Sequence, residues 1–357
     1  MKHKILLSLL VLALGAGIFL SWHSIGFPRT PVPLISPLVL PEKFLRSGSV
    51  GYWWSEEGLL SLQSHINQLD IVTLYLYGLE QDGEVTLGEV VKPITETQLL
   101  SLAHQQDTEI ILGINNFERP ELLDGLLNDP AVLEKHFQRL ATLIEEKGYD
   151  GVAIDYENLR DDQTEAFTDY IQRLSAELHA NNKKLVVTTL VDRDGHVWSG
   201  IDAAAISSAV DRLELQTFGE HGSNSEPGPE ASMGWVDDMI TNAITEGVPA
   251  EKIVFGVAYT GNDWLRSDTT EHEGASTQAT LAKLRAINAQ AQWDHESQSS
   301  FYEYEDEAGQ EHIVWIEDVL STKAKMERFR PYGVGGIFLW FIGGEDPRIW
   351  DTEDGIS

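Results

Sequence analysis

Short apolar runs alternate with longer amphipathic stretches along the chain from Ser47 onward. Short apolar runs are typical of buried strands, and apolar positions three or four residues apart are typical of helices that cover a sheet. We expect eight strands, at Ser49–Trp54, Ile71–Tyr77, Glu109–Ile114, Gly151–Glu157, Lys184–Leu190, Arg212–Phe218, Lys252–Tyr259 and Gly335–Phe341. Helical segments such as Pro130–Lys147 and Thr164–Asn181 lie between them. Eight strands that alternate with helices over roughly 310 residues predict an α/β fold, a (β/α)8 TIM barrel.

The stretch between the seventh and eighth expected strands is long enough to hold further structure. Thr277–Ala289 has the pattern of a helix, whereas Ser300–Glu305 and His312–Ile316 have the pattern of strands. We therefore expect a small α+β insertion, at about residues 265–318, beside the mouth of the barrel.

The first residues differ from the rest of the chain. Lys2 and Lys4 precede Ile5–Trp22, which carries no charge. At about 1.5 Å per residue this stretch makes roughly 27 Å of helix, barely enough to cross a bilayer. We favour an uncleaved anchor in residues 1–24 with the lysines inside, as the positive-inside rule indicates. A signal peptide cleaved near Ala13–Gly15 is the main alternative, and a buried core helix is the third.

A proline-rich segment follows this stretch. Phe27–Lys43 contains five prolines, a density that disfavours helix and favours stiff, extended backbone. We expect residues 25–45 to be a spacer and residues 46–357 to form the barrel. Both main interpretations of the N-terminus place the barrel outside the cytoplasm, either anchored to the membrane or secreted. The N-terminal segment is then the only part that contacts a membrane.

Composition narrows the classes of function. The length of 357 residues suits one large barrel. Because the chain has no cysteine, disulfides, Cys-ligated zinc and a thiol nucleophile are excluded. The 25 Lys and Arg residues face 57 Asp and Glu residues, a formal net charge of −32. A surface this acidic repels nucleic acid and anionic lipid, so we expect no nucleic-acid partner.

Two acids lie on the fourth expected strand, where a TIM barrel carries its active groups at the C-terminal mouth. Residues two apart on a strand share a face, so Ala153, Asp155 and Glu157 are expected to point together into the barrel. Two carboxylates in that place raise one pKa and favour a shared proton, which suits a general acid beside an ionised neighbour. A buried ion pair or a hydrogen-bonded pair that braces the barrel is the alternative.

This strand resembles the Asp-x-x-Asp-x-Asp-x-Glu signature of glycoside hydrolase family 18, the chitinase family. Asp150, Asp155 and Glu157 fill three of its four acidic positions. Further segments look like parts of the same family, and two of them, Gly113–Phe117 and Glu220–Pro229, look like its bacterial spore-cortex-lytic branch. The others are Ser49–Trp54, Val314–Asp318, Gly335–Trp340 and Gly344–Trp350. The resemblance covers about 300 residues and implies the TIM barrel independently of the strand count.

The resemblance implies a retaining hydrolysis that uses no protein nucleophile. Glu157 would protonate the glycosidic oxygen, and the 2-acetamido oxygen of the substrate would attack the anomeric carbon. Asp155 would accept the acetamido N–H and stabilise the positive charge of the oxazolinium ion. Trp340 would lie beneath the central sugar, with ordinary core packing as its alternative. Tyr52 and Tyr259 also end strands and are candidates for sugar contacts or for the wall of the barrel.

Three residues depart from the family pattern. The remaining acidic position of the signature is Ala153 here, which should weaken control of the pKa of Asp155. Phe218 and Gly219 stand where the family usually has Tyr-Asp on the sixth strand, and losing each polar group could cost about 10²-fold or more in rate. Glu220 persists beside them, and Gln216 could supply a replacement amide. We count Gln216, Phe218 and Glu220 among the expected substrate-binding residues.

Three functions remain open from the sequence. The first is an exported glycosidase that cuts β-1,4 bonds next to N-acetylhexosamine, in peptidoglycan or a chitin-like polymer, with peptidoglycan favoured for an anchored enzyme. The second is a non-catalytic glycan-binding protein that uses Trp340. The third is metal-dependent hydrolysis through Asp155, Glu157 and His221, which no ligand spacing supports, so we expect neither a metal nor a cofactor.

Overall fold

The computed structural model describes residues 43–88, 92–117, 119–190 and 200–351. All of these residues belong to one compact unit, Val39–Ser357. The expected anchor and all but the last three residues of the expected spacer lie outside the described residues. Among the described helices, none combines the length and apolar character that crossing a bilayer requires.

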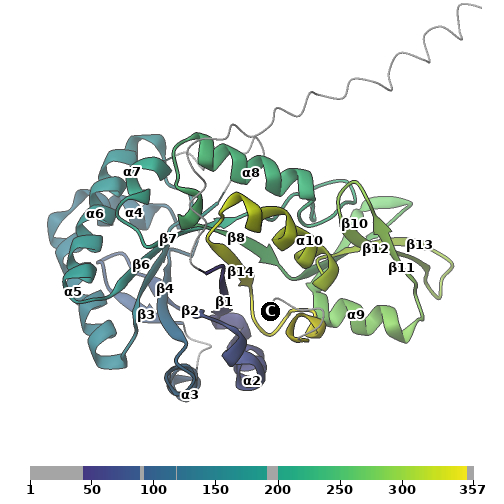
Figure 1. Ribbon diagram of the computed structural model, residues 1–357, viewed down its shortest axis with the longest axis horizontal. Coiled ribbons are helices and arrows are strands. Elements are labelled where there is room, and N and C mark those ends of the chain that lie inside the picture. Colours follow the sequence, from purple (N-terminus) through teal and green to yellow (C-terminus); the bar gives the residue numbers. More distant parts are fainter. Residues whose placement is uncertain (1–42, 89–91, 118, 191–199, 352–357) are drawn as a thin grey trace, which may run out of the picture. The chain divides into compact units, whose positions relative to one another are not determined.

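Eight parallel strands close into a barrel, which confirms the predicted fold (Figure 1). They are β1 (Leu45–Gly51), β2 (Ile71–Leu79), β4 (Glu109–Asn115), β5 (Gly151–Asp155), β6 (Lys184–Leu190), β7 (Arg212–Gln216), β8 (Ile253–Ala258) and β14 (Gly336–Trp340). Neighbouring strands follow the order β1-β14-β8-β7-β6-β5-β4-β2, and pairing between β1 and β2 closes the circle. A short strand that the sequence did not predict, β3 (Val85–Leu87), pairs antiparallel with β2.

Helices cover the outside of the barrel. They are α2 (Ser55–His65), α3 (Pro93–Gln105), α4 (Glu121–Asn128), α5 (Pro130–Lys147), α6 (Thr164–Ala180), α7 (Ala203–Ser207), α8 (Met233–Thr245) and α10 (Val319–Phe329). Short 3₁₀ turns lie at Tyr52–Trp54, Ile66–Gln68, Asp161–Gln163, Ala250–Lys252, Arg330–Tyr332 and Pro347–Trp350. In α5, the Asp129 side chain accepts a hydrogen bond from the Ala131 N–H, and Gly148 ends the helix in the left-handed region.

Three of the expected strands end two or more residues earlier in the structure than the sequence indicated. The first strand ends at Gly51, and Tyr52–Trp54 forms a 3₁₀ turn instead. The strand with the acid pair ends at Asp155, where it pairs last with Asn115 of β4. The backbone of Glu157 is bound by a side chain instead of a neighbouring strand, so apolar pattern alone extends the strand too far. Similarly, β7 ends at Gln216 and not at Phe218.

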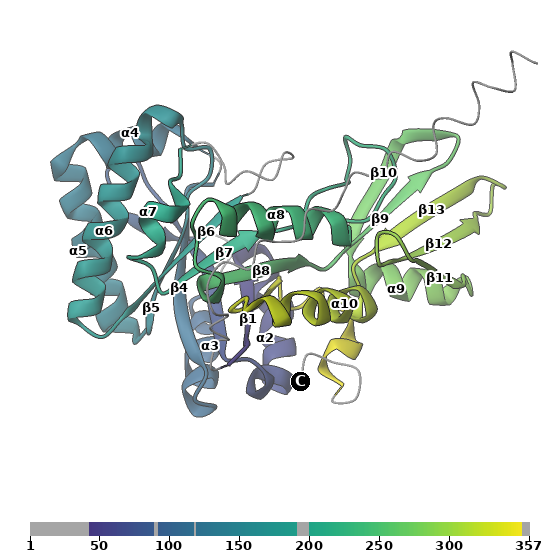
Figure 2. The ribbon, with the colours of Figure 1, turned by 45° about the horizontal axis from the view of Figure 1, so that its top comes forward.

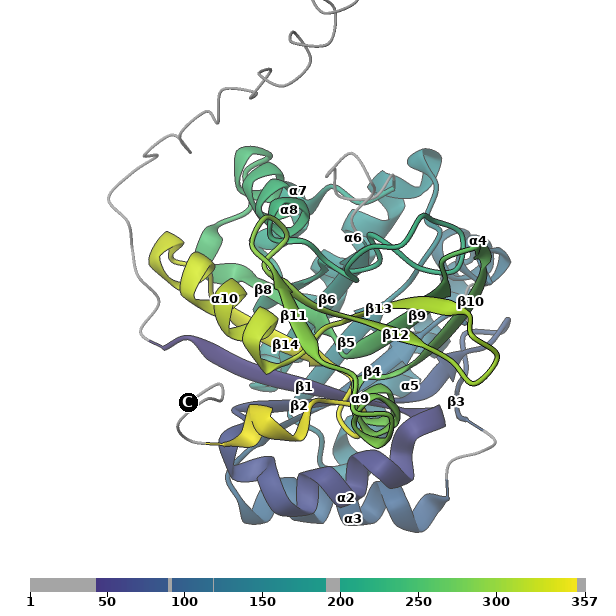
Figure 3. The same ribbon diagram turned by 90° about the vertical axis from the view of Figure 1, so that its right-hand side faces the viewer.

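The expected insertion lies between β8 and β14, beside the barrel (Figures 2 and 3). It consists of β9 (Thr260–Leu265), β10 (Asp268–Ser276), α9 (Thr277–Ala286), β11 (Ala291–Asp294), β12 (Ser299–Glu305) and β13 (Glu311–Ile316). The strands form an antiparallel sheet in the order β10-β9-β13-β12-β11. Leu281 and Leu284 of α9 pack on Tyr302, Val314 and Ile316 of this sheet, which gives the insertion a small core of its own.

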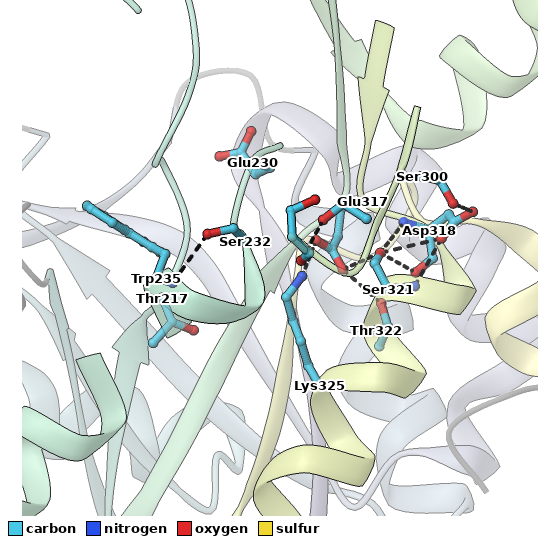
Figure 4. Close-up of polar contacts among 12 residues, drawn as sticks. Thr217, Glu230, Ser232, Trp235, Ser300, Glu317, Asp318, Ser321, Thr322 and Lys325 are labelled. Atoms are coloured by element: carbon cyan, nitrogen blue, oxygen red, sulfur yellow. Dashed lines mark hydrogen bonds and ion pairs between the residues drawn. The ribbon is translucent and has the colours of Figure 1, made fainter. Parts of the chain in front are cut away.

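A buried ion pair joins the end of the insertion to the barrel (Figure 4). Glu317 directly follows β13, and its Oε2 lies 2.5 Å from Nζ of Lys325 on α10. The two side chains are only 2% and 1% exposed. Ser321 donates a hydrogen bond to the other carboxylate oxygen at 2.7 Å. Both charges are therefore compensated inside the protein, where an unpaired charge would be costly.

We expect Lys325→Met to lower the free energy of unfolding by about 3–5 kcal/mol, because it leaves Glu317 buried without its counter-ion. Urea-induced unfolding measures the change. The double variant Glu317→Gln/Lys325→Met should regain most of the loss, since it removes the unpaired charge. Arg328→Ala on the same helix is the matched control: its exposed pair with Asp237 should be worth at most about 1 kcal/mol. An equal effect of Lys325→Met and Arg328→Ala would contradict the assignment.

Candidate active site

The interior of the barrel has an apolar floor. Ile71, Tyr75, Ile111, Ala153 and Val186 form one buried cluster there, and Trp340 packs against it. Tyr75 crosses the interior because Gly113 on β4 has no side chain: a Cβ atom at that position would lie 2.5 Å from the tyrosine ring. The polar groups of the site are thus held over a packed layer and not over a channel.

Asp155 lies at the C-terminal end of β5 and is 5% exposed. Gln216, at the end of β7, donates a hydrogen bond from Nε2 to Asp155 Oδ1 at 3.3 Å. Burial raises the pKa of Asp155 well above its ordinary value, and the charges of Glu157 and Glu214 raise it further. Asp155 is therefore a carboxyl group that keeps its proton more readily than an exposed aspartate. The amide of Gln216 is thus directed at Asp155, and its predicted contact with a substrate stays a prediction.

Glu157 follows β5 by two residues and is partly exposed. Asn116, which directly follows β4, binds its backbone twice. The Glu157 N–H donates to Asn116 Oδ1 at 3.0 Å, and Asn116 Nδ2 donates to the Glu157 carbonyl at 3.0 Å. The next residue, Asn158, has φ of +62°, a region that asparagine adopts more readily than most residues. The side chain of Asn116, which follows β4, thus fixes the point at which the chain turns away after β5.

Aromatic rings surround Trp340 at the end of β14. Phe218 lies nearly parallel to it at 6.4 Å between ring centroids, and Tyr75 and Trp53 contact it edge-on at 5.6 and 6.0 Å. Tyr52 contacts Trp53 at 4.6 Å and belongs to the same group. Trp53 is 42% exposed, so it offers an open aromatic face next to Trp340. Trp53 lies within the Ser49–Trp54 motif, but nothing in the sequence pattern distinguishes it from its neighbours.

Two expected sugar contacts are not brought to this group. Tyr259 is buried in the layer between the barrel and its helices, and its hydroxyl lies 3.1 Å from Thr322 Oγ1 on α10. The carboxylate of Glu220 accepts hydrogen bonds from the N–H and the hydroxyl of Ser232, at 2.6 and 3.0 Å, at the start of α8. The expected sugar-binding roles of both residues are therefore corrected: Tyr259 joins the barrel to a helix, and Glu220 closes a loop.

The exit of β7, where the side chains depart from the family pattern, has a backbone that favours glycine. Gly219 has φ of +86°, which favours glycine. Its N–H donates to the carboxylate of Glu230 at 2.9 Å, and the same carboxylate binds Thr260 and Asn262 of β9. A carboxylate is therefore still present beside position 219, but it comes from residue 230 and is bound to the insertion.

The outer face of β5 is held by a buried histidine. His136 of α5 lies 3.1 Å from the Gly83 carbonyl through Nδ1, and 3.1 Å from the hydroxyls of both Tyr156 and Tyr170 through Nε2. This arrangement requires a proton on Nδ1 and a free lone pair on Nε2. Burial lowers the pKa of His136 to about 4. A neutral imidazole therefore supports Tyr156, the residue between Asp155 and Glu157.

Within the described residues, no three His, Asp or Glu side chains come together in a way that could hold a metal ion. His221, the histidine of the metal hypothesis, has its Nδ1 3.0 Å from the Glu226 carbonyl in the loop after β7.

Comparison with known proteins identifies the family. The model of glycosyl hydrolases family 18 matches residues 49–345. The chain is 27% identical over 272 residues to a putative sporulation-specific glycosylase, YdhD, of Bacillus subtilis, covering 74% of this chain and 64% of the relative. It is 28% identical over 274 residues to the cortical fragment-lytic enzyme of the same organism, covering 74% of this chain and 63% of the relative. The chain thus spans less than two thirds of the length of either relative.

A solved structure has the same fold. A chitinase from Chromobacterium violaceum superposes with a TM-score of 0.76 at 23% identity, covering 86% of this chain and 97% of that one.

The histidine behind β5 makes the stability of the protein depend on pH. An unfolded histidine takes up a proton near pH 6.5, whereas folded His136 does so only near pH 4. Its contribution is therefore complete above pH 6.5 and is lost as the pH falls from 6.5 to 4, by on the order of 3 kcal/mol. His136→Gln should remove this part of the pH dependence. Urea unfolding of both proteins at several pH values measures the difference, and parallel curves would disprove it.

Proposed function

Because the chain belongs to glycosyl hydrolases family 18, we propose that it hydrolyses glycosidic bonds next to N-acetylhexosamine. The observation that carries the proposal is the pair at the end of β5. A buried Asp155 with a raised pKa lies two residues before Glu157, whose backbone is fixed, and aromatic rings stand beside them. A pair of acids with different environments can divide the roles of general acid and charge stabiliser.

In the proposed reaction, Glu157 gives its proton to the glycosidic oxygen as the bond to the anomeric carbon breaks. The acetamido oxygen of the same sugar forms the new bond to that carbon, which gives an oxazolinium ion. Asp155 accepts the acetamido N–H and stabilises the positive charge. Glu157 then takes a proton from a water molecule, whose oxygen bonds to the anomeric carbon. The oxazolinium ring opens, and the anomeric configuration is retained overall. Trp340 supports the pyranose from below, and Trp53 lies beside it.

Gln216 compensates in part for the groups missing at the exit of β7. Its amide donates to one oxygen of Asp155 and leaves the other oxygen for the substrate. Phe218, in contrast, offers only an apolar ring beside Trp340. We therefore propose that the enzyme orients the acetamido group with fewer hydrogen bonds than the family pattern provides, and that it turns over more slowly.

We propose peptidoglycan as the first substrate to test. Support comes from two relatives, a putative sporulation-specific glycosylase and a cortical fragment-lytic enzyme. The uncharged stretch Ile5–Trp22 supports export and attachment at the membrane, where the enzyme meets its own envelope first. Chitin oligomers are the alternative substrate, and mass analysis of the products released from each polymer separates the two.

A non-catalytic glycan-binding protein is the second candidate. It is favoured by one observation: Ala153, Phe218 and Gly219 together remove the polar groups that the family places around the reacting sugar. The aromatic group around Trp340 would then suffice for binding.

The variant Glu157→Gln distinguishes the two candidates. Removing the general acid should lower the release of reducing ends by about 10²-fold or more, while affinity for the glycan stays within about threefold, since the amide keeps the size of the side chain. Reducing-end assays and calorimetric titration with the same N-acetylated oligosaccharide measure both. Glu121→Gln, an exposed glutamate of α4, is the matched control and should behave like the wild type.

Equal behaviour of the wild type and Glu157→Gln on every N-acetylated glycan would reject the hydrolase and favour the binding protein.

Asn116 provides a second test, because it holds Glu157 without being able to transfer a proton itself. Asn116→Ala should lower kcat by about ten- to a hundredfold through misplacement of Glu157, with a much smaller change in KM. Asn128→Ala is the control, since its amide binds only the Asp124 carbonyl on the surface of α4. A loss confined to KM would contradict a positioning role for Asn116.

A further inference from the structure

One buried carboxylate of the barrel interior has no place in the reaction proposed above. Glu214 lies in the middle of β7, on the same face of the strand as Arg212 and Gln216, and only 2% of it is exposed. Burying an ionisable side chain this deeply costs free energy unless its surroundings compensate for the lost water. The groups around Glu214 therefore indicate what it does.

Hydroxyl groups bind this carboxylate. Thr188 on β6 donates to Glu214 Oε2 at 3.2 Å, and Ser47 Oγ on β1 lies 3.5 Å from Oε1. Thr188 in turn lies 2.6 Å from the hydroxyl of Tyr75 on β2. A hydroxyl can donate to a carboxylate and can accept from a carboxylic acid. These partners therefore suit both protonation states of Glu214.

Glu214 is linked to the candidate active site through its own strand. Gln216, two residues further along the same face, donates to Asp155. Asp155 faces the same interior from β5 and is subject to the charge of Glu214. Ala153, which stands at the second acidic position of the family signature, contributes only a methyl group to the buried cluster below Asp155. The interior thus lacks a carboxylate on β5 and has an additional one on β7.

We propose that Glu214 is the second acid of a pair with Asp155, and that it takes over from β7 the role of the carboxylate missing at Ala153. Glu214 is a positioning residue: it sets the charge of Asp155 and does not touch the sugar. This inference rests on the proposed function, because the charge of Asp155 matters for catalysis only if Asp155 binds the acetamido group.

The two carboxyls act on each other through charge. Burial raises the pKa of Glu214, and the charge of Arg212 and the hydroxyls of Thr188 and Ser47 only partly oppose this. A negative charge on Glu214 raises the pKa of Asp155, so the charge of Glu214 sets how easily Asp155 ionises when it binds the acetamido group. Tyr75 on β2 and Glu157 after β5 are the other ionisable groups that act on the pair.

The test is the titration of Asp155 in protein labelled with ¹³C at the aspartate carboxyl carbons. Asp155→Asn assigns the signal, and the Glu157→Gln background stops turnover. Removal of the neighbouring negative charge in Glu214→Gln should lower the titration midpoint of Asp155 by about one pH unit or more. Glu214→Gln/Ala153→Asp should restore it, because the acid returns on β5. Ser47→Ala, which keeps the charge of Glu214, is the control and should cause no comparable shift.

Turnover gives a second readout. In Glu214→Gln with Glu157 intact, the acidic limb of the kcat/KM profile should move to lower pH by the same amount, and Ala153→Asp should move it back. A merely structural role for Glu214 would change the stability or the amplitude of the profile and leave its midpoint in place. Unchanged Asp155 midpoints in folded Glu214→Gln overturn the proposal.

The single variant Ala153→Asp keeps the test decisive if Glu214→Gln does not fold. It adds a third carboxyl and should raise the Asp155 midpoint, whereas an unchanged midpoint overturns the proposed equivalence of the two positions. A wild type that hydrolyses no glycan rejects the proposed function, and the titration still decides whether Glu214 and Asp155 act as a pair.

Discussion

The cost of burying carboxylates inside a closed barrel governs the arrangement of this site. Asp155 and Glu214 both lie in the interior, at 5% and 2% exposure, where water cannot stabilise their charges. The structure offers Asp155 an amide from Gln216, and it offers Glu214 the hydroxyls of Thr188 and Ser47 together with the charge of Arg212. Burial nevertheless raises the pKa of each carboxyl. Burial also raises the pKa of Glu317, but there the ammonium group of Lys325 lies directly beside the carboxylate. The buried carboxyls of this protein therefore differ in the partners that compensate their charge.

The rigidity of the surrounding elements keeps these groups in place. Tyr156, which directly follows β5, is held from outside by His136, while Asp155 at the end of that strand faces inward. The next turn is fixed by the two hydrogen bonds between Asn116 and the backbone of Glu157. Asp155 is thus buried and Glu157 is partly exposed, although only Tyr156 separates them. This is possible because different side chains hold the residues of this segment in place. A general acid must reach solvent-borne substrate, whereas its partner must stay dry, and a strand that ends between them provides both environments.

The sequence predicted the barrel because parallel strands are buried on both faces and therefore appear as apolar runs. Prediction from the sequence failed for a strand and for side chains whose positions do not depend on the apolar pattern. The strand β10 is polar except for Gly274 and Ala275, and it exists because β9 pairs with it. Tyr259 directly follows a strand, but its side chain turns outward to Thr322. Glu220 is bound by Ser232, 12 residues further along the chain. Proximity to a strand end in the sequence is thus a weak guide to where a side chain points, because neighbouring residues face opposite sides.

Polar groups that are missing at family positions in the sequence are partly supplied by other residues that lie nearby in the structure. The methyl of Ala153 replaces a carboxylate, yet Glu214 brings one into the same interior from β7. Gly219 lacks a side chain, yet its N–H is bound by the carboxylate of Glu230. Phe218 lacks a hydroxyl, yet Gln216 donates to Asp155 from the same strand. A barrel places eight strand ends around one small space, so the same chemical group can enter that space from several positions. For this fold, a motif with missing acids is therefore weak evidence for lost chemistry until the neighbouring strands have been considered.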